Sequence, residues 1–141
     1  ASIKDIKHTP KYAFLITDSG MTEVTRPSLY GAQHPVTAVL NDAMNGTSSY
    51  IVSGKCCESG DILTPAPGDS ESLQPRLMKR AQIDDLVVIG GAGAYCAGMS
   101  TANYNSYPRA AEVLIDLKEK AHLIRKRESI DNLFRNEIQV V

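Results

Sequence analysis

Short apolar segments separated by turn-forming residues are the feature that most restricts the fold of this chain. Each segment is rich in β-branched or aromatic residues and shows no helical period, which is typical of β-strands. Because strands and helices do not alternate regularly, a parallel α/β sheet is disfavoured. The pattern predicts a mainly β fold, either an antiparallel β-barrel or a β-sandwich. The predicted strands cover residues 12–17, 35–40, 50–54, 84–90, 110–116 and 121–126, the last two as a hairpin.

Other parts of the chain predict connections. Residues 1–11 are polar and contain Pro10, so we expect an irregular lead-in. Residues 41–49 read as a loop with Asn45-Gly46 as its turn signal. Further local candidates are a short strand at 62–64, a mixed connection over 65–82 with a brief helical turn at 73–78, and a final short helix capped by Ser129 with an apolar stripe of Ile130, Leu133 and Phe134.

Length and composition exclude several classes of protein. The 141 residues fit one domain over 1–141, and we find no internal repeat or linker that divides it. The net charge of −1 gives no basic stripe for nucleic acid, and no apolar run approaches the ~20 residues of a membrane span. The three cysteines, two of them adjacent, do not make a disulfide framework, which indicates a reducing, cytoplasmic setting.

The stretch from Lys55 to Asp61 holds the densest set of reactive groups. It contains two thiols and two carboxylates, and it follows the apolar run at 50–52, so a strand delivers titratable groups to its own end. A cysteine thiol can exchange a proton near neutral pH, which makes Cys57 with Glu58 a candidate acid–base pair. A buried structural thiol beside a surface carboxylate is the alternative. Since neighbouring residues of a strand point to opposite faces, only one of Cys56 and Cys57 is expected to face a site, unless the strand has ended before them.

Two more stretches offer binding groups. Arg26 precedes Pro27 on a constrained turn and Tyr30 follows four residues later, so the pair could clamp a carboxylate; a surface ion pair and a half-buried ring are the alternative. The glycine-rich run 90–94 before Tyr95 would let a ligand approach the backbone, although it is not a dinucleotide-binding fingerprint.

No metal site is predicted. The adjacent cysteines lack the spacing of zinc ligands, and the histidines are far apart in the sequence. No catalytic role is assigned to His8, His34 or His122.

Taken together, several motifs resemble the C-terminal portion of the diaminopimelate decarboxylase family, from about Tyr12 to the final helix. Their order and spacing agree with that family along essentially the whole chain. The motifs are Asp18-Ser19-Gly20-Met21, Arg26-Pro27-Ser28-Leu29-Tyr30-Gly31, Cys57-Glu58-Ser59-Gly60-Asp61, Gly93-Ala94-Tyr95 with Met99-Ser100, and Asn103-Tyr104-Asn105 with residues 108–114.

The resemblance implies a pyridoxal-phosphate (PLP) enzyme of the alanine-racemase-like fold type, with a TIM barrel followed by a β-domain. It implies decarboxylation of meso-diaminopimelate to L-lysine. It also implies that Cys57 supplies the proton to the carbanion carbon, that Glu58 binds the distal ammonium, and that Arg26 and Tyr30 bind the distal carboxylate. Tyr95 is expected to lie against cofactor and substrate. Related ornithine and arginine decarboxylases typically carry Asp after the cysteine and lack the Arg-Pro-x-Leu-Tyr motif, since their substrates have no second carboxylate, so Glu58 and Arg26 favour diaminopimelate.

The same resemblance implies what this chain does not carry. The Schiff-base lysine and the phosphate-binding glycines of the family lie on the barrel domain, and no lysine here matches that motif. We therefore expect a C-terminal domain that is inactive by itself, with its own barrel domain and a second copy of the enzyme as partners. A stand-alone β-domain with a binding or regulatory role, and a related diamino-acid decarboxylase domain, are the alternatives.

Overall fold

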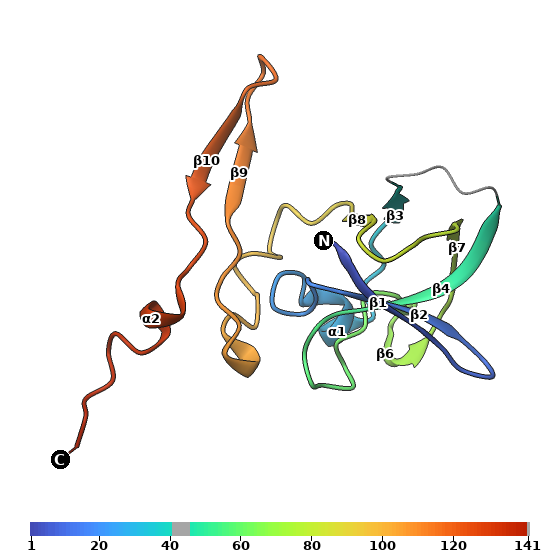
Figure 1. Ribbon diagram of the computed structural model, residues 1–141, viewed down its shortest axis with the longest axis horizontal. Helices are drawn as coiled ribbons and strands as arrows, with labels where there is room; N and C mark the ends of the chain where they lie inside the picture. Colours follow the sequence, from blue (N-terminus) through green and yellow to red (C-terminus); the bar gives the residue numbers. More distant parts are fainter. Residues whose placement is uncertain (41–45, 141) are drawn as a thin grey trace. The chain divides into compact units, whose positions relative to one another are not determined.

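β-Strands form most of the regular structure in the computed structural model, which describes residues 1–40 and 46–140 (Figure 1). The prediction of a mainly β fold is confirmed. The chain divides into two compact units, residues 1–101 and residues 102–141. Each unit is described by itself below.

A four-stranded sheet is the largest element of the first unit. Its strands follow the order β1-β2-β4-β7, with β1 and β7 at the edges. The β1–β2 and β4–β7 pairs are antiparallel, but β2 and β4 are parallel, which differs from the predicted all-antiparallel arrangement. A parallel pair needs a long crossover, and the chain between β2 and β4 provides one. The strands are β1 Ile3–His8, β2 Ala13–Thr17, β4 Thr47–Ser53 and β7 Arg76–Lys79.

Two antiparallel pairs and one short helix complete this unit. β3 (Val36–Val39) pairs with β8 (Leu86–Ile89), and β5 (Pro65–Ala66) pairs with β6 (Asp69–Leu73). Helix α1 covers Arg26–Tyr30. The sheets are open, and the described residues do not form a closed barrel.

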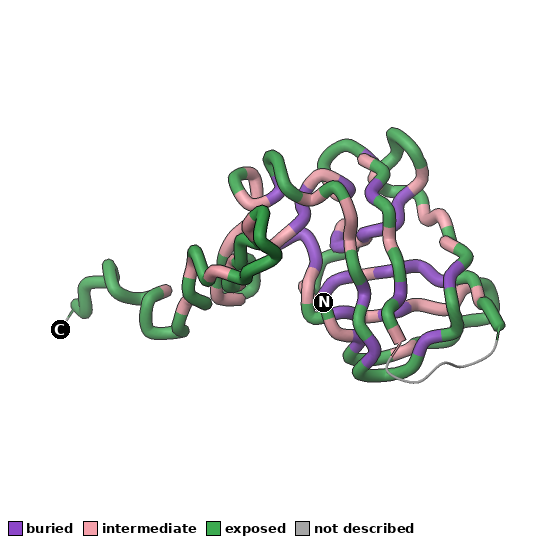
Figure 2. The backbone as a smooth tube through the Cα atoms, turned by 90° about the horizontal axis from the view of Figure 1, so that it is seen from above, coloured by how far each residue is buried: buried purple, intermediate pink, exposed green. Residues whose placement is uncertain are grey.

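The core of the first unit contains apolar residues of strands that the sequence pattern predicted, such as Leu15 and Val87, together with Ile3 of β1, which was not predicted as a strand. Consecutive residues of β4 are buried on both faces of the sheet, so that strand is covered on both sides. Figure 2 shows the buried positions of this unit in purple. The largest fully buried apolar side chains are Ile3, Leu15, Ile51, Leu63, Val52 and Val87.

The second unit is a β-hairpin between two short helical turns. The predicted hairpin is confirmed, with β9 at Glu112–Ile115 antiparallel to β10 at Ala121–Arg125. A 3-10 turn covers Tyr104–Ser106 and helix α2 covers Ile130–Leu133. No residue between 102 and 140 is buried (Figure 2). Helix α2 confirms the predicted short final helix. Ser129 makes no side-chain capping bond, however, and Ile130 and Phe134 of the predicted apolar stripe are exposed.

Three local predictions are wrong. Most of the predicted lead-in is strand β1, because Pro10 falls in the turn before β2 and not inside a strand. β4 begins at Thr47, so residues 47–49 of the predicted loop pair with β7; Asn45 lies outside the described residues. The predicted helical turn at 73–78 is instead the end of β6 and most of β7, since cross-strand pairing outweighs a weak local helical preference. At 62–64, only Ile62 makes an isolated bridge, to Ser53.

Gly31 ends helix α1 in the left-handed conformation, with φ of 60°. A Cβ there would collide with the backbone of Gly68 and Asp69. We expect Gly31→Ala to destabilise the chain by more than the ~1 kcal/mol of the left-handed conformation alone. Gly68→Ala is the matched control, because Gly68 has φ of 71° but open space around it. Thermal unfolding of both variants measures the difference, and equal losses would contradict the steric argument.

Candidate functional site

The titratable groups of residues 55–61 lie on a loop that follows β4 and folds back onto it. The Gly54 N–H donates to the Asp61 carbonyl (2.9 Å), which closes the loop at its base. The Asp61 N–H donates to the Glu58 carbonyl (3.1 Å), which forms the turn at its tip. The sequence places a strand end directly before the polar residues, and the structure accordingly presents them on an exposed loop.

Cys57 and Glu58 lie at the tip of this loop, and both are exposed. The Glu58 carboxylate accepts hydrogen bonds from the Gly60 N–H (3.0 Å) and the Ser59 hydroxyl (3.3 Å). These local bonds orient one carboxylate oxygen. An oriented, exposed carboxylate can bind a cation such as an ammonium group.

Cys56 has a different environment from Cys57. Its side chain is partly buried, and burial raises the pKa of the Cys56 thiol to about 12, with the charge and hydrogen bond of Asp61 acting in the same direction. A thiol with so high a pKa stays protonated near neutral pH and is a poor nucleophile. The regular strand ends at Ser53, so strand alternation does not decide which cysteine is accessible; the loop does.

Asp61 is the buried anchor of the loop, a role that is not evident from its place in the sequence. The whole residue is only 3% exposed. One carboxylate oxygen accepts the Met21 N–H (2.6 Å) and the other accepts the Cys56 N–H (2.8 Å). The carboxylate therefore joins residues 20–21 to the loop. Gly20 directly precedes Met21 and Gly54 lies two residues before Cys56, and these two glycines were the available sequence signal.

A second carboxylate, that of Glu23, connects the same two segments. It forms an ion pair with Lys55 (3.1 Å) while accepting the Gly20 N–H (3.0 Å). Lys55 also donates to the Asp18 carbonyl (3.0 Å). Both ion-pair side chains are largely shielded from water, which limits screening of the pair. Sequence reasoning missed this pair because its members are 32 residues apart.

Helix α1 carries two further predicted site residues. Pro27 occupies its first turn, where the missing N–H costs no hydrogen bond, and the Thr25 hydroxyl before it donates to the Met21 carbonyl (2.6 Å). Arg26 is half-buried and Tyr30 is exposed. The helix is one short turn because Gly31 ends it in the left-handed conformation.

A cavity of about 380 Å³ lies between α1, the loop tip and β6. It brings together two of the predicted motifs, because Ser28 lies between Arg26 and Tyr30 and Glu58 follows Cys57. Arg26, Tyr30 and Cys57 are not among its lining residues. The lining consists of Ser28, Glu58, Ser59, Gly60, Ser70 and Glu71. It is a polar cavity with two carboxylates, a composition that suits a cationic ligand group.

Tyr95 lies in the turn that follows β8 and is 68% exposed. Its φ of 68° is a left-handed conformation that is uncommon for a residue with a side chain. The preceding glycine-rich segment is held by His34, whose Nδ1 lies 3.1 Å from the Gly90 carbonyl oxygen. Tyr95 does not line the cavity beside Glu58.

The part of the chain that the structure describes shows neither a metal-ligating cluster nor a membrane-spanning helix. Within 1–40 and 46–140, no group of three or more His, Cys, Asp or Glu residues is arranged to hold a metal ion. Over the same described range, no helix has the length and apolar character needed to cross a membrane.

Comparison with known proteins defines the family. The protein-family model described as "Pyridoxal-dependent decarboxylase, C-terminal sheet domain" matches residues 1–93 of this chain. The chain therefore belongs to the pyridoxal-dependent decarboxylases, whose C-terminal sheet domain it contains.

Diaminopimelate decarboxylases are similar to this chain along nearly its whole length. The one from Buchnera aphidicola subsp. Baizongia pistaciae is 34% identical over 145 residues, which cover 100% of this chain and 34% of that protein. A diaminopimelate decarboxylase crystal structure has a TM-score of 0.86 at 33% identity, covering 94% of this chain and 32% of that one. The Helicobacter pylori diaminopimelate decarboxylase complexed with L-lysine has a TM-score of 0.80 at 30% identity, covering 96% and 30%. The chain spans about a third of the length of the curated relatives it matches.

Proposed function

We propose that this chain is the C-terminal domain of an enzyme that converts meso-2,6-diaminopimelate to L-lysine and CO2. The names of its relatives and the L-lysine bound by the Helicobacter pylori protein support this assignment. The observation that carries it is the cavity beside α1, because Glu58 and Ser28 border the same space. A carboxylate therefore lies near the helix that bears Arg26 and Tyr30.

In this proposal the residues divide the work on a substrate that has an amino group and a carboxylate at each end. Cys57 donates the proton to the α-carbon after CO2 has left. Glu58 binds the distal ammonium group, while Arg26 and Tyr30 bind the distal carboxylate. Tyr95 contacts cofactor and substrate. The exposure of Cys57 and the protonated, partly buried state of Cys56 favour Cys57 as the donor.

The residues of this chain fit a supporting role toward PLP. Tyr95 is exposed, and a Cβ at Gly93 would meet nothing within 4 Å, so a planar group has room to approach this segment. When bound, PLP supplies delocalisation of the electron pair that decarboxylation leaves on the α-carbon. We assign the Schiff-base lysine and most phosphate contacts to the barrel domain, as the family resemblance implies.

The proposed partners are the barrel domain of the same enzyme and a second enzyme copy in a homodimer. Cys57 and Glu58 then act in the active site of the opposite protomer. We further propose that an N-terminal segment of the whole enzyme covers the open sheet edges and completes the barrel or sandwich. A cytoplasmic location agrees with the three free cysteines.

Co-expression with a barrel domain tests the function. The 141-residue chain is produced together with the barrel domain of the Helicobacter pylori or Escherichia coli relative, and the resulting hybrid enzyme is supplied with PLP and meso-diaminopimelate. We expect a complex that releases CO2 and forms L-lysine, whereas the chain alone releases none. If neither barrel domain forms a complex and no CO2 appears, the stand-alone binding or regulatory β-domain is the better assignment.

Substrate choice separates the main proposal from a related diamino-acid decarboxylase. A hybrid enzyme that prefers ornithine, arginine or lysine over meso-diaminopimelate would contradict the role of Arg26 and Tyr30. These competing substrates lack the second carboxylate, so a carboxylate clamp gives them no additional binding.

Glu58→Gln is expected to lower kcat/KM for meso-diaminopimelate by about 10- to 100-fold, because a charge-assisted hydrogen bond contributes about 1.5–3 kcal/mol. Most of the loss should appear in KM, since the distal ammonium does not react. Steady-state kinetics of the hybrid enzyme measures this change. Glu71→Gln is the matched control, since Glu71 lines the same cavity. Equal losses in the two variants would show that only the cavity's charge matters.

A further inference from the structure

Asp61 is a buried, titratable group that the proposed reaction does not use. Its carboxylate accepts backbone N–H groups from Met21 and Cys56, which lie in separate segments of the chain. Charge-assisted bonds of this kind are short and roughly twice as strong as neutral ones. A solvent-shielded carboxylate without a paired cation is costly unless such bonds compensate for the lost water. Asp61 therefore has a defined structural partner on each oxygen.

The chain around Asp61 is shaped to admit its carboxylate. A Cβ on Gly20 or on Gly54 would overlap with the Asp61 carboxyl group. Neither glycine has a positive φ. The absence of a side chain at these two positions is therefore explained by space for Asp61 and not by backbone conformation.

The carboxylate that accepts the Cys56 N–H also acts on the thiol of the same residue. Burial is the largest influence on this thiol, and Asp61 adds a negative charge and a side-chain hydrogen bond. Lys55 opposes these effects through its positive charge, while Glu23 adds to them. Lys55 is itself paired with Glu23. Asp61 acts on the Cys56 thiol both through its charge and through a hydrogen bond.

We infer that Asp61 is a positioning residue with two linked effects: by accepting the Met21 and Cys56 N–H groups it fixes the loop that presents Cys57 and Glu58, and it makes the neighbouring Cys56 the less reactive of the two thiols. The two adjacent cysteines thereby become chemically distinct, with Cys56 partly buried beside Asp61 and Cys57 exposed at the loop tip. The relevance to catalysis of this difference between the two thiols (the thiol selection) rests on the proposed function. The difference itself is a property of this chain and can be measured without any enzymatic activity.

Alkylation of single thiols tests the inference. The 141-residue chain with Cys57→Ser is treated with iodoacetamide between pH 7 and pH 10.5, and mass spectrometry follows labelling of Cys56. We expect Cys56 to react at least ~100-fold more slowly than glutathione at pH 8.5, because its thiolate fraction is far smaller. If Cys56 reacts at the same rate as glutathione and with the same pH profile, the inference is overturned, and no Asp61 variant is needed to show it.

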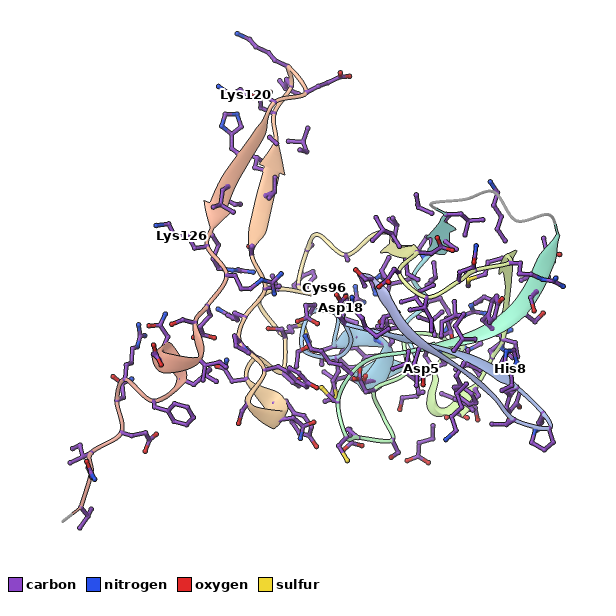
Figure 3. The ribbon with its side chains drawn as sticks, viewed as in Figure 1. Asp5, His8, Asp18, Cys96, Lys120 and Lys126 are labelled. Carbon is purple, nitrogen blue, oxygen red and sulfur yellow. The ribbon has the colours of Figure 1, made fainter. Side chains whose placement is uncertain are left out.

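Asp61→Asn in the same background removes the charge while keeping the shape. We expect Cys56 labelling at pH 9 to rise about tenfold, with the pH profile shifted to lower pH, although burial still keeps it slower than glutathione. Asp5→Asn on β1 is the matched control, since Asp5 is exposed and distant in sequence; Figure 3 labels it. Its Cys56 profile should be unchanged.

Cys96, labelled in Figure 3, separates a local effect from unfolding, because it is 1% exposed and reacts only if the unit opens. If Cys96 remains protected and the Cys56 profile does not move in Asp61→Asn, Asp61 does not control this thiol. If Asp61→Asn exposes Cys96, the unit has opened and this variant no longer reports on Asp61 alone. The inference is then tested by the pH profile of the Cys57→Ser chain and by Gly54→Ala, which displaces the carboxylate without removing it.

The hybrid enzyme distinguishes this inference from the proposed function. Asp61→Asn is expected to lower kcat severalfold more than it changes KM, because it misplaces the proton donor. An inactive hybrid enzyme with the expected Cys56 profile contradicts the function and leaves the thiol selection intact. An active hybrid enzyme with an ordinary Cys56 profile contradicts the thiol selection alone.

Discussion

Replacing Cys57 by alanine in the hybrid enzyme is expected to lower kcat by about 10²- to 10⁴-fold, the usual contribution of a positioned acid or base. KM should change little, because in this proposal the thiol acts after CO2 has left and holds no part of the bound substrate. Cys57 is exposed at the tip of its loop, so the substitution leaves no core cavity. Steady-state release of CO2 from meso-diaminopimelate measures the effect.

Cys56→Ala is the control for this experiment, since it changes the neighbouring thiol. The Cys56 thiol has a pKa raised to about 12, and it is expected to contribute no proton transfer near neutral pH. A loss of less than tenfold in kcat is therefore expected. Equal kcat values for Cys57→Ala and the unchanged hybrid enzyme would contradict the proton-donor assignment. A larger loss of kcat in Cys56→Ala than in Cys57→Ala would assign the donor role to Cys56.

Leu15→Ala is expected to destabilise the first unit by about 2–5 kcal/mol, the range for truncating a buried leucine. Leu15 lies in the middle of β2 with 0% exposure, and β2 pairs with both β1 and β4. The cavity would therefore open in the centre of the four-stranded sheet, where neighbouring strands cannot move inward freely. Denaturant unfolding of the 141-residue chain measures the loss.

Leu77→Ala makes the same chemical change at a surface position. Leu77 lies on β7 and is 71% exposed, so its truncation should change the free energy of unfolding by less than about 0.5 kcal/mol. Comparable losses in the two variants would mean that Leu15 does not occupy a packed core.

The apolar runs predicted most of the strands because each buries its own side chains. Residues 12–17, 50–54 and 84–90 contain Leu15, Ile51 and Val87, which are all fully buried or nearly so. Strand β1 was missed because its sequence is mostly polar, with lysines and an aspartate facing outward. Its place in the sheet depends on pairing with β2, and such pairing is not visible in local composition.

The candidate site was predicted in part. The motif with Cys57 and Glu58 was found as a dense cluster of titratable groups after a strand, and the structure presents it on an exposed loop. The residues that shape the loop were not found. Asp61 and Glu23 act on partners 40 and 32 residues away, and a single sequence does not reveal which distant backbone N–H groups a carboxylate will meet.

The sequence by itself determined a mainly β chain, the position of its apolar strands, and a cysteine–glutamate motif at a strand end, because these follow from local periodicity and residue chemistry. The local pattern did not distinguish Cys56 from Cys57, and only the family resemblance selected Cys57. The tertiary structure supplies the chemical difference, because Cys56 lies partly buried beside the carboxylate of Asp61 and Cys57 is exposed. The physical reason is that burial and neighbouring charge set the proton affinity of a thiol, and both depend on how distant segments pack.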